Sequence, residues 1–185
     1  MLTWLDLCSG LGGASQPAKD RGWRVIRVDI EPRFKPDIVA DVRSLPLKPF
    51  PVDVLWASPP CQEFSKWGMR CFFPDPPLPD ISLVIGVLRA IERIRPDWWI
   101  VENVRSSRPW LSKLFGCVQA CSIGHAFWSN RVLMIPPTRH HKGGREAHEV
   151  GVRWGREAEY AAEWSKIPYE IGEAICRAVE ARHAG

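Results

Sequence analysis

The feature that most constrains the fold is an alternation of short apolar runs with turns and helix-like stretches. Residues 2–7, 52–56 and 98–104 have the length and apolar content of strands buried in a sheet. Residues 83–94 have the apolar spacing of a helix, which we expect Pro96 to end. Strands that alternate with helices in this way are typical of a parallel sheet, so the sequence predicts an α/β fold.

Shorter segments complete the predicted architecture. We expect further strands at residues 23–28 and 36–42, and a closing pair of strands at 117–121 and 131–135. Helices are expected at 16–21 and 110–115, and a last helix opens at Ile167 with Pro168 in its first turn. Residues 64–79 are rich in Pro, Gly and aromatic residues and contain Cys71, which predicts a functional loop.

The composition is that of an ordinary globular protein, because 45% of the 185 residues are hydrophobic and 25% are charged. This length suits one domain with its own core, so we expect residues 1–185 to form a single domain. The chain has no apolar run of membrane-spanning length, and its six cysteines are scattered rather than arranged as a disulfide framework. We therefore expect a cytoplasmic protein without a membrane partner. The spacing of Cys117, Cys121 and His125 matches no familiar set of zinc ligands, so we expect no metal site.

A glycine-rich turn follows the first predicted strand, at residues 8–13. Glycines between a strand and a helix let backbone N–H groups approach a ligand that side chains would block. Asp29 ends the second strand about twenty residues later, where nucleotide-binding α/β folds hold ribose hydroxyls, and Asp41 ends the third. Each carboxylate alone is equally consistent with a solvated turn. The three strand ends together favour a nucleoside ligand.

A second turn presents a cysteine after the strand at 52–56. Pro59 and Pro60 stop that strand and fix an extended turn, and polar residues follow Cys61. A lone cysteine is more often a buried thiol than a reactive one. A thiol displayed at the carboxyl end of a strand and flanked by polar groups is instead a candidate nucleophile.

These motifs together resemble the ordered motifs of the cytosine-C5 DNA methyltransferases. The resemblance rests on residues 6–13, on Pro59-Pro60-Cys61-Gln62 and on Glu102-Asn103-Val104, and more weakly on residues 129–131 and the helix at Ile167. It covers about residues 2–135 and 167–180. It implies a Rossmann-like S-adenosylmethionine-dependent methyltransferase fold, with a mostly parallel seven-stranded sheet and helices on both faces.

The resemblance also implies a role for each matching residue. Cys61 would attack C6 of cytosine, Glu102 would bond to N3 and the exocyclic amine, and Arg131 would help to hold the base or the cysteine turn. The residues expected to bind S-adenosylmethionine, and S-adenosylhomocysteine as product, are Asp6, Cys8, Gly10, Leu11, Gly12, Gly13, Asp29, Ile30, Asp41, Val42, Ser58 and Pro59. Those expected at the substrate are Pro60, Gln62, Ser65 and Asn103, together with Arg139, Lys142 and Arg145 of a basic loop.

The chemistry of these residue types agrees with that role. Carbon 5 of cytosine is a poor nucleophile until a group adds at C6, and a thiolate such as that of Cys61 is suited to the addition. Charge then develops toward N3 and O2, where the carboxyl group of Glu102 can neutralise it. In duplex DNA the base must first leave the stack to reach such a pocket.

The chain departs from the family pattern in two places. Leu133 stands where the family has a second arginine, and Ser129 stands where a glutamine is usual. Residues 136–166 form a reduced segment where the family inserts a target-recognition domain.

We therefore expect a cytosine-C5 DNA methyltransferase with low intrinsic sequence specificity, or one that a targeting partner guides. Two alternatives stay open, namely a free cytosine nucleotide as substrate and a catalytically weak relative that binds nucleic acid. The sequence does not decide the target sequence or the oligomeric state.

The reduced segment generates a prediction about DNA binding. Arg139, Lys142 and Arg145 can meet phosphates, but phosphate contacts carry no base code. A specific interface buries on the order of 1,000 Å² of protein surface, more than this segment can supply while it also returns the chain to the last helix. We expect DNA binding that is weak, salt-dependent and indifferent to sequence, and an alanine triple variant at these positions should flatten its salt slope. Methylation confined to one site of four or more base pairs, detected by bisulfite sequencing, would contradict this expectation.

Overall fold

A single seven-stranded sheet forms the centre of the computed structural model, which describes residues 1–68, 75, 77–122, 124–136 and 166–184. The strand order is β3-β2-β1-β4-β5-β7-β6. The strands are β1 (Thr3–Leu7), β2 (Arg24–Asp29), β3 (Ile38–Val39), β4 (Val54–Ala57), β5 (Trp98–Val104), β6 (Ala120–Ser122) and β7 (His125–Ser129). The first five are parallel, whereas β7 runs antiparallel to both β5 and β6. The predicted mostly parallel seven-stranded sheet is confirmed.

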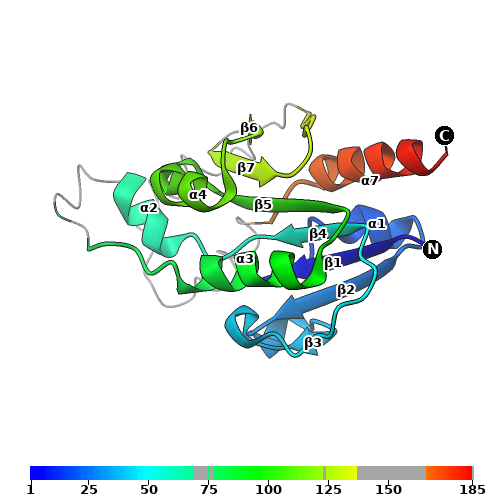
Figure 1. The fold of residues 1–185 in the computed structure, drawn as a ribbon, viewed down its shortest axis with the longest axis horizontal. Coiled ribbons are helices and arrows are strands. Elements are labelled where there is room, and N and C mark those ends of the chain that lie inside the picture. Colours follow the sequence, from blue (N-terminus) through cyan, green and yellow to red (C-terminus); the bar gives the residue numbers. More distant parts are fainter. Residues whose placement is uncertain (69–74, 76, 123, 137–165, 185) are drawn as a thin grey trace, which may run out of the picture.

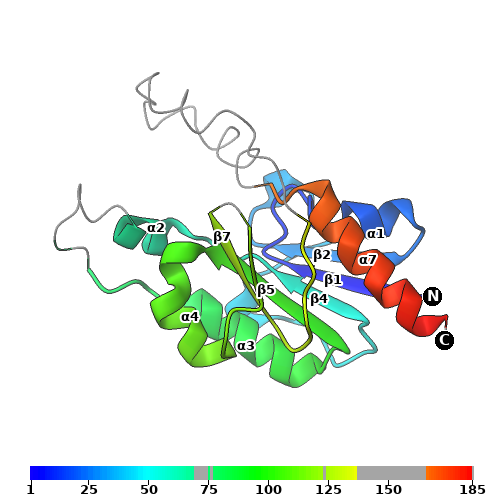
Figure 2. The ribbon, with the colours of Figure 1, turned by 90° about the horizontal axis from the view of Figure 1, so that it is seen from above.

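Helices cover both faces of this sheet, as predicted. They are α1 (Gln16–Asp20), α2 (Gln62–Gly68), α3 (Ser82–Ile94), α4 (Arg108–Phe115) and α7 (Tyr169–His183), with 3-10 turns η1 (Pro32–Phe34), η2 (Val42–Ser44) and η3 (Arg105–Ser107). Figures 1 and 2 show α1 and α7 on one face of the sheet and α3 and α4 on the other. In the described part of the chain, no helix has the length and apolar character needed to cross a membrane.

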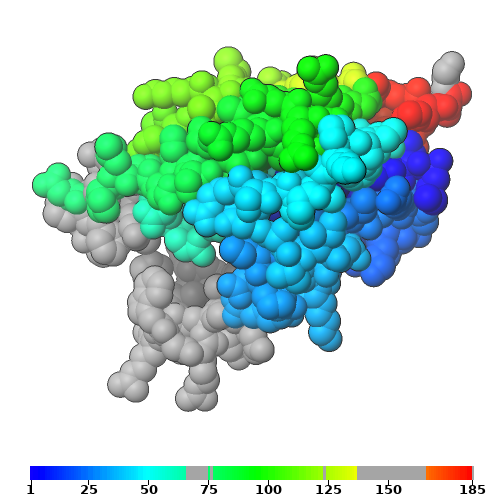
Figure 3. Space-filling model, turned by 60° about the horizontal axis from the view of Figure 1, so that its bottom comes forward, coloured from blue at the N-terminus to red at the C-terminus, as the bar shows by residue number. Residues whose placement is uncertain are grey.

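The core consists of two apolar clusters, one on each face of the sheet. Side chains of a strand alternate between the faces, so Leu5 and Leu55 pack under α3 while Trp4 and Trp56 pack under α7. Burial on both faces explains why β4 is apolar throughout and why most of β1 is apolar. On the first face α3 lies directly against η2, and Figure 3 shows the surfaces of these two parts of the chain side by side.

Two predicted segments differ from the structure. The closing strands were expected at residues 117–121 and 131–135, but they lie at Ala120–Ser122 and His125–Ser129. Gly124 adopts a φ of +82° in the turn between them, which lets the chain reverse earlier than the apolar pattern indicated. Residues 64–79 were expected to form a loop, but residues 64–68 belong to α2, because the carbonyl of Cys61 accepts the N–H groups of Phe64 and Ser65. Cys71 and most of the remaining expected loop lie outside the described residues.

The contact between α7 and α1 generates a stability prediction. A Cβ at Gly172 would lie 2.2 Å from the backbone oxygen of Ala14, and backbone cannot move away as a flexible side chain can. Replacing a helical glycine by alanine ordinarily stabilises by about 0.5–1 kcal/mol. We expect Gly172→Ala to destabilise by about 1–3 kcal/mol instead, because overpacking outweighs that gain. The reverse change at an exposed position of the same helix, Ala178→Gly, measures the effect of helix propensity alone. A urea midpoint for Gly172→Ala at or above that of the wild type would contradict the close contact between Gly172 and Ala14.

Candidate active site

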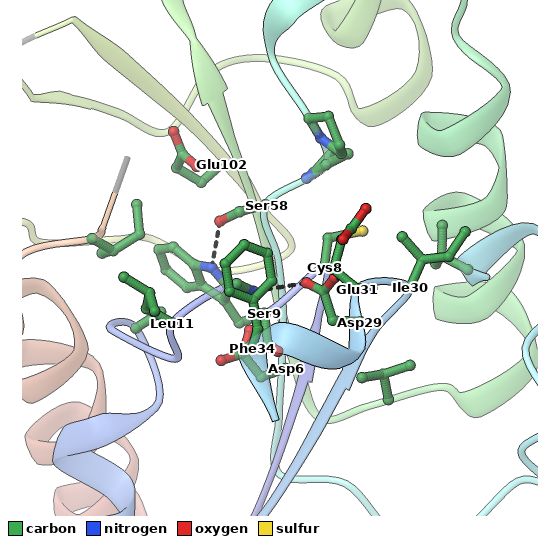
Figure 4. Close-up of a pocket in the computed structure, with 18 of the residues that line it drawn as sticks. Asp6, Cys8, Ser9, Leu11, Asp29, Ile30, Glu31, Phe34, Ser58 and Glu102 are labelled. Carbon is green, nitrogen blue, oxygen red and sulfur yellow. Dashed lines mark hydrogen bonds between the residues drawn. The ribbon is translucent and has the colours of Figure 1, made fainter. Parts of the chain in front are cut away.

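A cavity of about 630 Å³ opens at the carboxyl ends of β1, β2, β4 and β5. The strand order reverses direction between β1 and β4, which is where open α/β sheets bind their ligands. In Figure 4 Glu102 and Ser58 approach the cavity from one side, and Asp29, Ile30 and Glu31 approach it from the other. The volume lies within the range of small-molecule and cofactor sites.

The glycine turn after β1 forms one wall of the cavity. Gly10 and Gly12 have φ values of +48° and +75°, a backbone region that residues other than glycine rarely adopt. A Cβ at Gly13 would lie 2.8 Å from the backbone oxygen of Ile167, so the turn is also packed tightly from behind. The N–H of Gly12 donates to the carbonyl of Ser9 at 2.8 Å, which closes the turn. This geometry leaves backbone facing the cavity.

Arg27 holds the glycine turn in place, a role that the sequence reasoning missed. Its Nη2 donates to the carbonyl of Gly10 at 2.5 Å and to that of Phe34 in η1 at 3.0 Å. Its Nε is buried and has no hydrogen-bond partner within the described residues, and a Cβ at Gly12 would lie 2.7 Å from it. Arg27 therefore ties the turn after β1 to the turn after β2. The signal was an arginine in the interior of the second strand, between the apolar residues Ile26 and Val28.

The acidic wall of the cavity comes from the ends of β2 and β3. The carboxylate of Asp29 accepts the N–H of Gly10 at 2.8 Å and that of Glu31 at 2.9 Å, and it retains further acceptor capacity for a hydroxyl donor. Asp41 caps η2 and binds the guanidinium of Arg43, which lowers the pKa of the Asp41 carboxyl. Ile30, exposed to 56%, also lines the cavity.

Burial disfavours the charged form of two ionisable groups below the glycine turn. Burial raises the pKa of Asp6 to about 7, although Ser15 donates a hydrogen bond of 2.5 Å to its carboxyl. Burial also raises the pKa of the Cys8 thiol far above its ordinary value. Cys8 therefore stays a thiol and serves as packing.

The turn after β4 presents Cys61 to the cavity. The N–H of Ser58 donates to the carbonyl of Leu7 at 3.2 Å, and the side-chain amide of Asn103 donates to the carbonyl of Pro59 at 2.8 Å. These bonds fix the proline turn to β1 on one side and to β5 on the other. Burial and, to a smaller extent, the charge of Glu102 raise the pKa of the Cys61 thiol, while a hydrogen bond from Ser65 lowers it. The thiolate therefore needs a compensating charge when it forms.

Glu102 reaches the cavity from β5 and has an imidazole partner. Only 6% of Glu102 is exposed, and its Oε1 lies 2.5 Å from Nδ1 of His125 on β7. This bond raises the pKa of His125 above its ordinary value. The sequence reasoning considered His125 only as a zinc ligand and missed this contact, because the antiparallel return of β7 that creates it was predicted at the wrong residues.

Arg131 does not reach the cavity, which corrects the expectation that it holds the base or the cysteine turn. Because β7 is antiparallel to β5, residues after Ser129 lie at the amino end of β5, opposite to the cavity. There Arg131 donates to the backbone and the carboxylate of Asp97, which also binds Arg182. Leu133, at the family's second arginine position, is buried in the core under α7.

Most of the predicted site residues line one cavity. Those in contact with it are Asp6, Cys8, Gly10, Leu11, Gly13, Asp29, Ile30, Asp41, Val42, Ser58, Pro59, Pro60, Cys61, Gln62 and Glu102. Gly12, Ser65 and Asn103 pack behind that lining. Arg139, Lys142 and Arg145 lie outside the described residues. Lining residues that the sequence reasoning did not select include Glu31, Phe34, His125 and Lys166.

Comparisons with known proteins point to one family. A family model described as C-5 cytosine-specific DNA methylase matches residues 2–108. The chain is 31% identical over 116 residues to a Frog virus 3 (isolate Goorha) protein named "Probable DNA (cytosine-5)-methyltransferase", covering 56% of this chain and 54% of that protein. It is 29% identical over 125 residues to type II methyltransferase M.HgiGI of Herpetosiphon aurantiacus, covering 60% of this chain and 94% of that one. The aligned part thus spans about half the length of the viral relative.

A comparison of structures gives a weaker likeness. The solved structure of the Entamoeba histolytica methyltransferase EhMeth is similar with a TM-score of 0.49 and 14% identity, covering 76% of this chain and 57% of that one.

The contacts of Arg27 generate a prediction about the cofactor turn. Arg27→Met keeps the side-chain bulk but removes the hydrogen bonds to the carbonyls of Gly10, Phe34 and Lys35. Each bond from a charged donor contributes about 1.5–3 kcal/mol, so we expect affinity for S-adenosylmethionine to fall by about tenfold or more. Arg24→Met, an exposed position on the same strand, is the matched control and should bind as wild type. Equal calorimetric affinities for the two variants would show that the turn does not depend on Arg27.

Proposed function

Because the chain belongs to the C-5 cytosine-specific DNA methylase family, we propose that it transfers a methyl group from S-adenosylmethionine to C5 of cytosine in DNA. The observation that carries the proposal is that one cavity is lined by the glycine turn, Cys61 and Glu102 together. A cofactor and a base can therefore meet between them.

The residues of the first wall fit S-adenosylmethionine. The glycine turn offers a surface without side chains where Cβ atoms would collide with their surroundings, and such a surface suits the methionine part. Asp29 and Glu31 supply acceptors for ribose hydroxyls, and Asp41 stands beside them for the adenine. When bound, the cofactor supplies an electrophilic methyl group. Its positive sulfonium charge agrees with the carboxylates around the cavity.

Cys61 supplies the nucleophile. Its sulfur, after losing the thiol proton to solvent, adds to C6 of cytosine and forms a carbon–sulfur bond. The electron pair of the C5–C6 double bond moves toward N3, and this makes C5 nucleophilic. The turn fixed by Asn103 and Ser58 holds Cys61 in place for this addition without further ordering.

Glu102 receives the charge that develops on the base. Its carboxyl group gives a proton to N3 as the thiolate adds, which leaves a neutral enamine-like ring and a carboxylate. After C5 has gained the methyl group, the C5 proton leaves to solvent and the Cys61 thiolate is expelled. N3 returns its proton to the Glu102 carboxylate, and the Cys61 thiolate takes a proton from solvent, so that both groups regain their starting states.

DNA is the proposed substrate, with little sequence specificity of the protein itself. The base must leave the stack to reach a half-buried thiol and a carboxyl group that is 6% exposed. The reduced segment at residues 136–166 leaves little chain to read bases, so we propose that target choice is relaxed or is supplied by a partner.

Adduct trapping tests this function directly. A 5-fluorocytosine base cannot release fluorine as a proton, so we expect the wild type with S-adenosylmethionine to form a stable covalent adduct at Cys61, located by peptide mass spectrometry. Cys61→Ser should abolish the adduct and leave cofactor affinity nearly unchanged, because serine is far less ionised than cysteine. Cys117→Ser, at an exposed cysteine, is the matched control and should react as wild type.

The substrates for this test are duplex DNA, single-stranded DNA, RNA and the nucleotide 5-fluoro-dCMP. An adduct on the free nucleotide alone would replace DNA by a nucleotide as the substrate. An adduct on Cys8 would contradict the assignment of the nucleophile, and no adduct on any substrate would contradict the function.

A further inference from the structure

The cavity contains one contact to Glu102 that the proposed reaction has not used. His125 stands opposite Val104 in the antiparallel pair of β5 and β7, which makes it the diagonal neighbour of Glu102 across the two strands. Its Nδ1 lies 2.5 Å from Oε1 of Glu102, and both side chains line the cavity. The His125 side chain is 34% exposed and that of Glu102 is 8% exposed. The imidazole therefore lies at the cavity surface and holds a nearly buried carboxyl group from one side.

The contact fixes which part of Glu102 is available to a base. With Oε1 bonded to His125, the other oxygen, Oε2, is the atom that can bond to N3 of a cytosine. A carboxyl group on a flexible side chain can otherwise present either oxygen in several rotamers. The bond to His125 holds one rotamer in advance, so the reaction does not have to supply the entropy of ordering it.

The charges around this contact are those that the reaction moves. The charge of Glu102 opposes ionisation of the Cys61 thiol, because it raises the pKa of that group. The hydrogen bond to Glu102 favours the charged imidazole, because it raises the pKa of His125 above 6.5. Within the described residues, the charge of Glu102 on β5 raises the pKa of both His125 and Cys61.

We propose that His125 is a positioning residue for Glu102, holding Oε2 toward N3 of the base and offsetting the carboxylate charge that appears when N3 receives its proton. Glu102, whose carboxylate is charged in the resting pair, takes a proton from solvent on Oε2 before the addition step. In that step the negative charge leaves the sulfur of Cys61, which becomes bonded to C6, and appears on Glu102, whose Oε2 proton moves to N3. His125 keeps both of its own protons. The positive imidazole of His125 donates a hydrogen bond to Glu102, and Glu102 is the group that becomes negative in the adduct. His125 therefore stabilises the adduct more than the starting state. This role rests on the proposed function.

The pairing itself can be tested without activity. In an NMR titration of the imidazole resonances, His125 of the wild type should titrate above pH 6.5, and in Glu102→Gln its midpoint should fall back toward 6.5. A midpoint of His125 that is the same in both proteins would overturn the proposal.

The role in the reaction is tested by the rate of adduct formation on 5-fluorocytosine DNA in a single turnover. We expect His125→Ala to slow the adduct by about 10- to 100-fold, and His125→Gln to recover part of that loss because its amide can still donate to Oε1. The double variant Glu102→Gln/His125→Ala should be no slower than Glu102→Gln alone, since His125 acts through Glu102.

His183→Ala is the matched control, because that imidazole also faces a carboxylate, Asp53, but does so away from the cavity. It should form the adduct at the wild-type rate. A wild-type rate for His125→Ala would overturn the role of His125 alone, and additive losses in the double variant would show that it does not act through Glu102. No adduct with the wild-type protein on any substrate would instead overturn the proposed function and this role together.

Discussion

The parallel pairing of β1, β4 and β5 is the constraint on which the candidate site depends. Parallel strands end at the same edge of a sheet, so the glycine turn after β1, the Cys61 turn after β4 and Glu102 on β5 meet although the sequence separates them by up to about a hundred residues. Two bonds make this meeting rigid, from Ser58 to the carbonyl of Leu7 and from Asn103 to the carbonyl of Pro59. The two bonds join the turn after β4 to Leu7 of β1 and to Asn103 of β5, so the positions of the reacting groups follow from the neighbouring strands.

The charges within the cavity follow from the same arrangement. Carboxylates from several strand ends, among them Asp29 and Glu102, converge on one space, and their mutual repulsion requires nearby cations or protons. Burial raises the pKa of Asp6 to about 7, so this carboxyl group takes up a proton more readily than an ordinary aspartate does. Arg27 places a permanent charge behind the glycine turn, and His125 places a titratable one beside Glu102. The permanent charge lies where structure must be kept, and the titratable charge lies where the proposed reaction moves a proton.

The sequence predicted what local patterns encode and missed what distant contacts create. Cys61 and Glu102 were found because each directly follows or ends an apolar run, and the carboxyl end of a strand is a position that can be read locally. Arg131 was expected in the site and lies at the opposite end of the sheet, because its position depends on where β7 turns back along β5. The same error hid His125. Arg27 was hidden differently, since a strand pattern shows a charge but not the carbonyls that receive its bonds.

The last segment of the described chain packs against the glycine turn and lines the cavity. The backbone oxygen of Ile167 lies 2.8 Å from the place that a Cβ of Gly13 would take, and α7 packs its Gly172 against the carbonyl of Ala14. Lys166 and Ile167 also line the cavity, so the chain returns to the sheet at the cavity edge. Whatever residues 137–165 contact, they are therefore joined to the fold beside the site at their carboxyl end. We propose that a longer insertion at this point would extend DNA recognition without altering the reacting groups, because it would rejoin the fold at the cavity edge, where Lys166 and Ile167 lie.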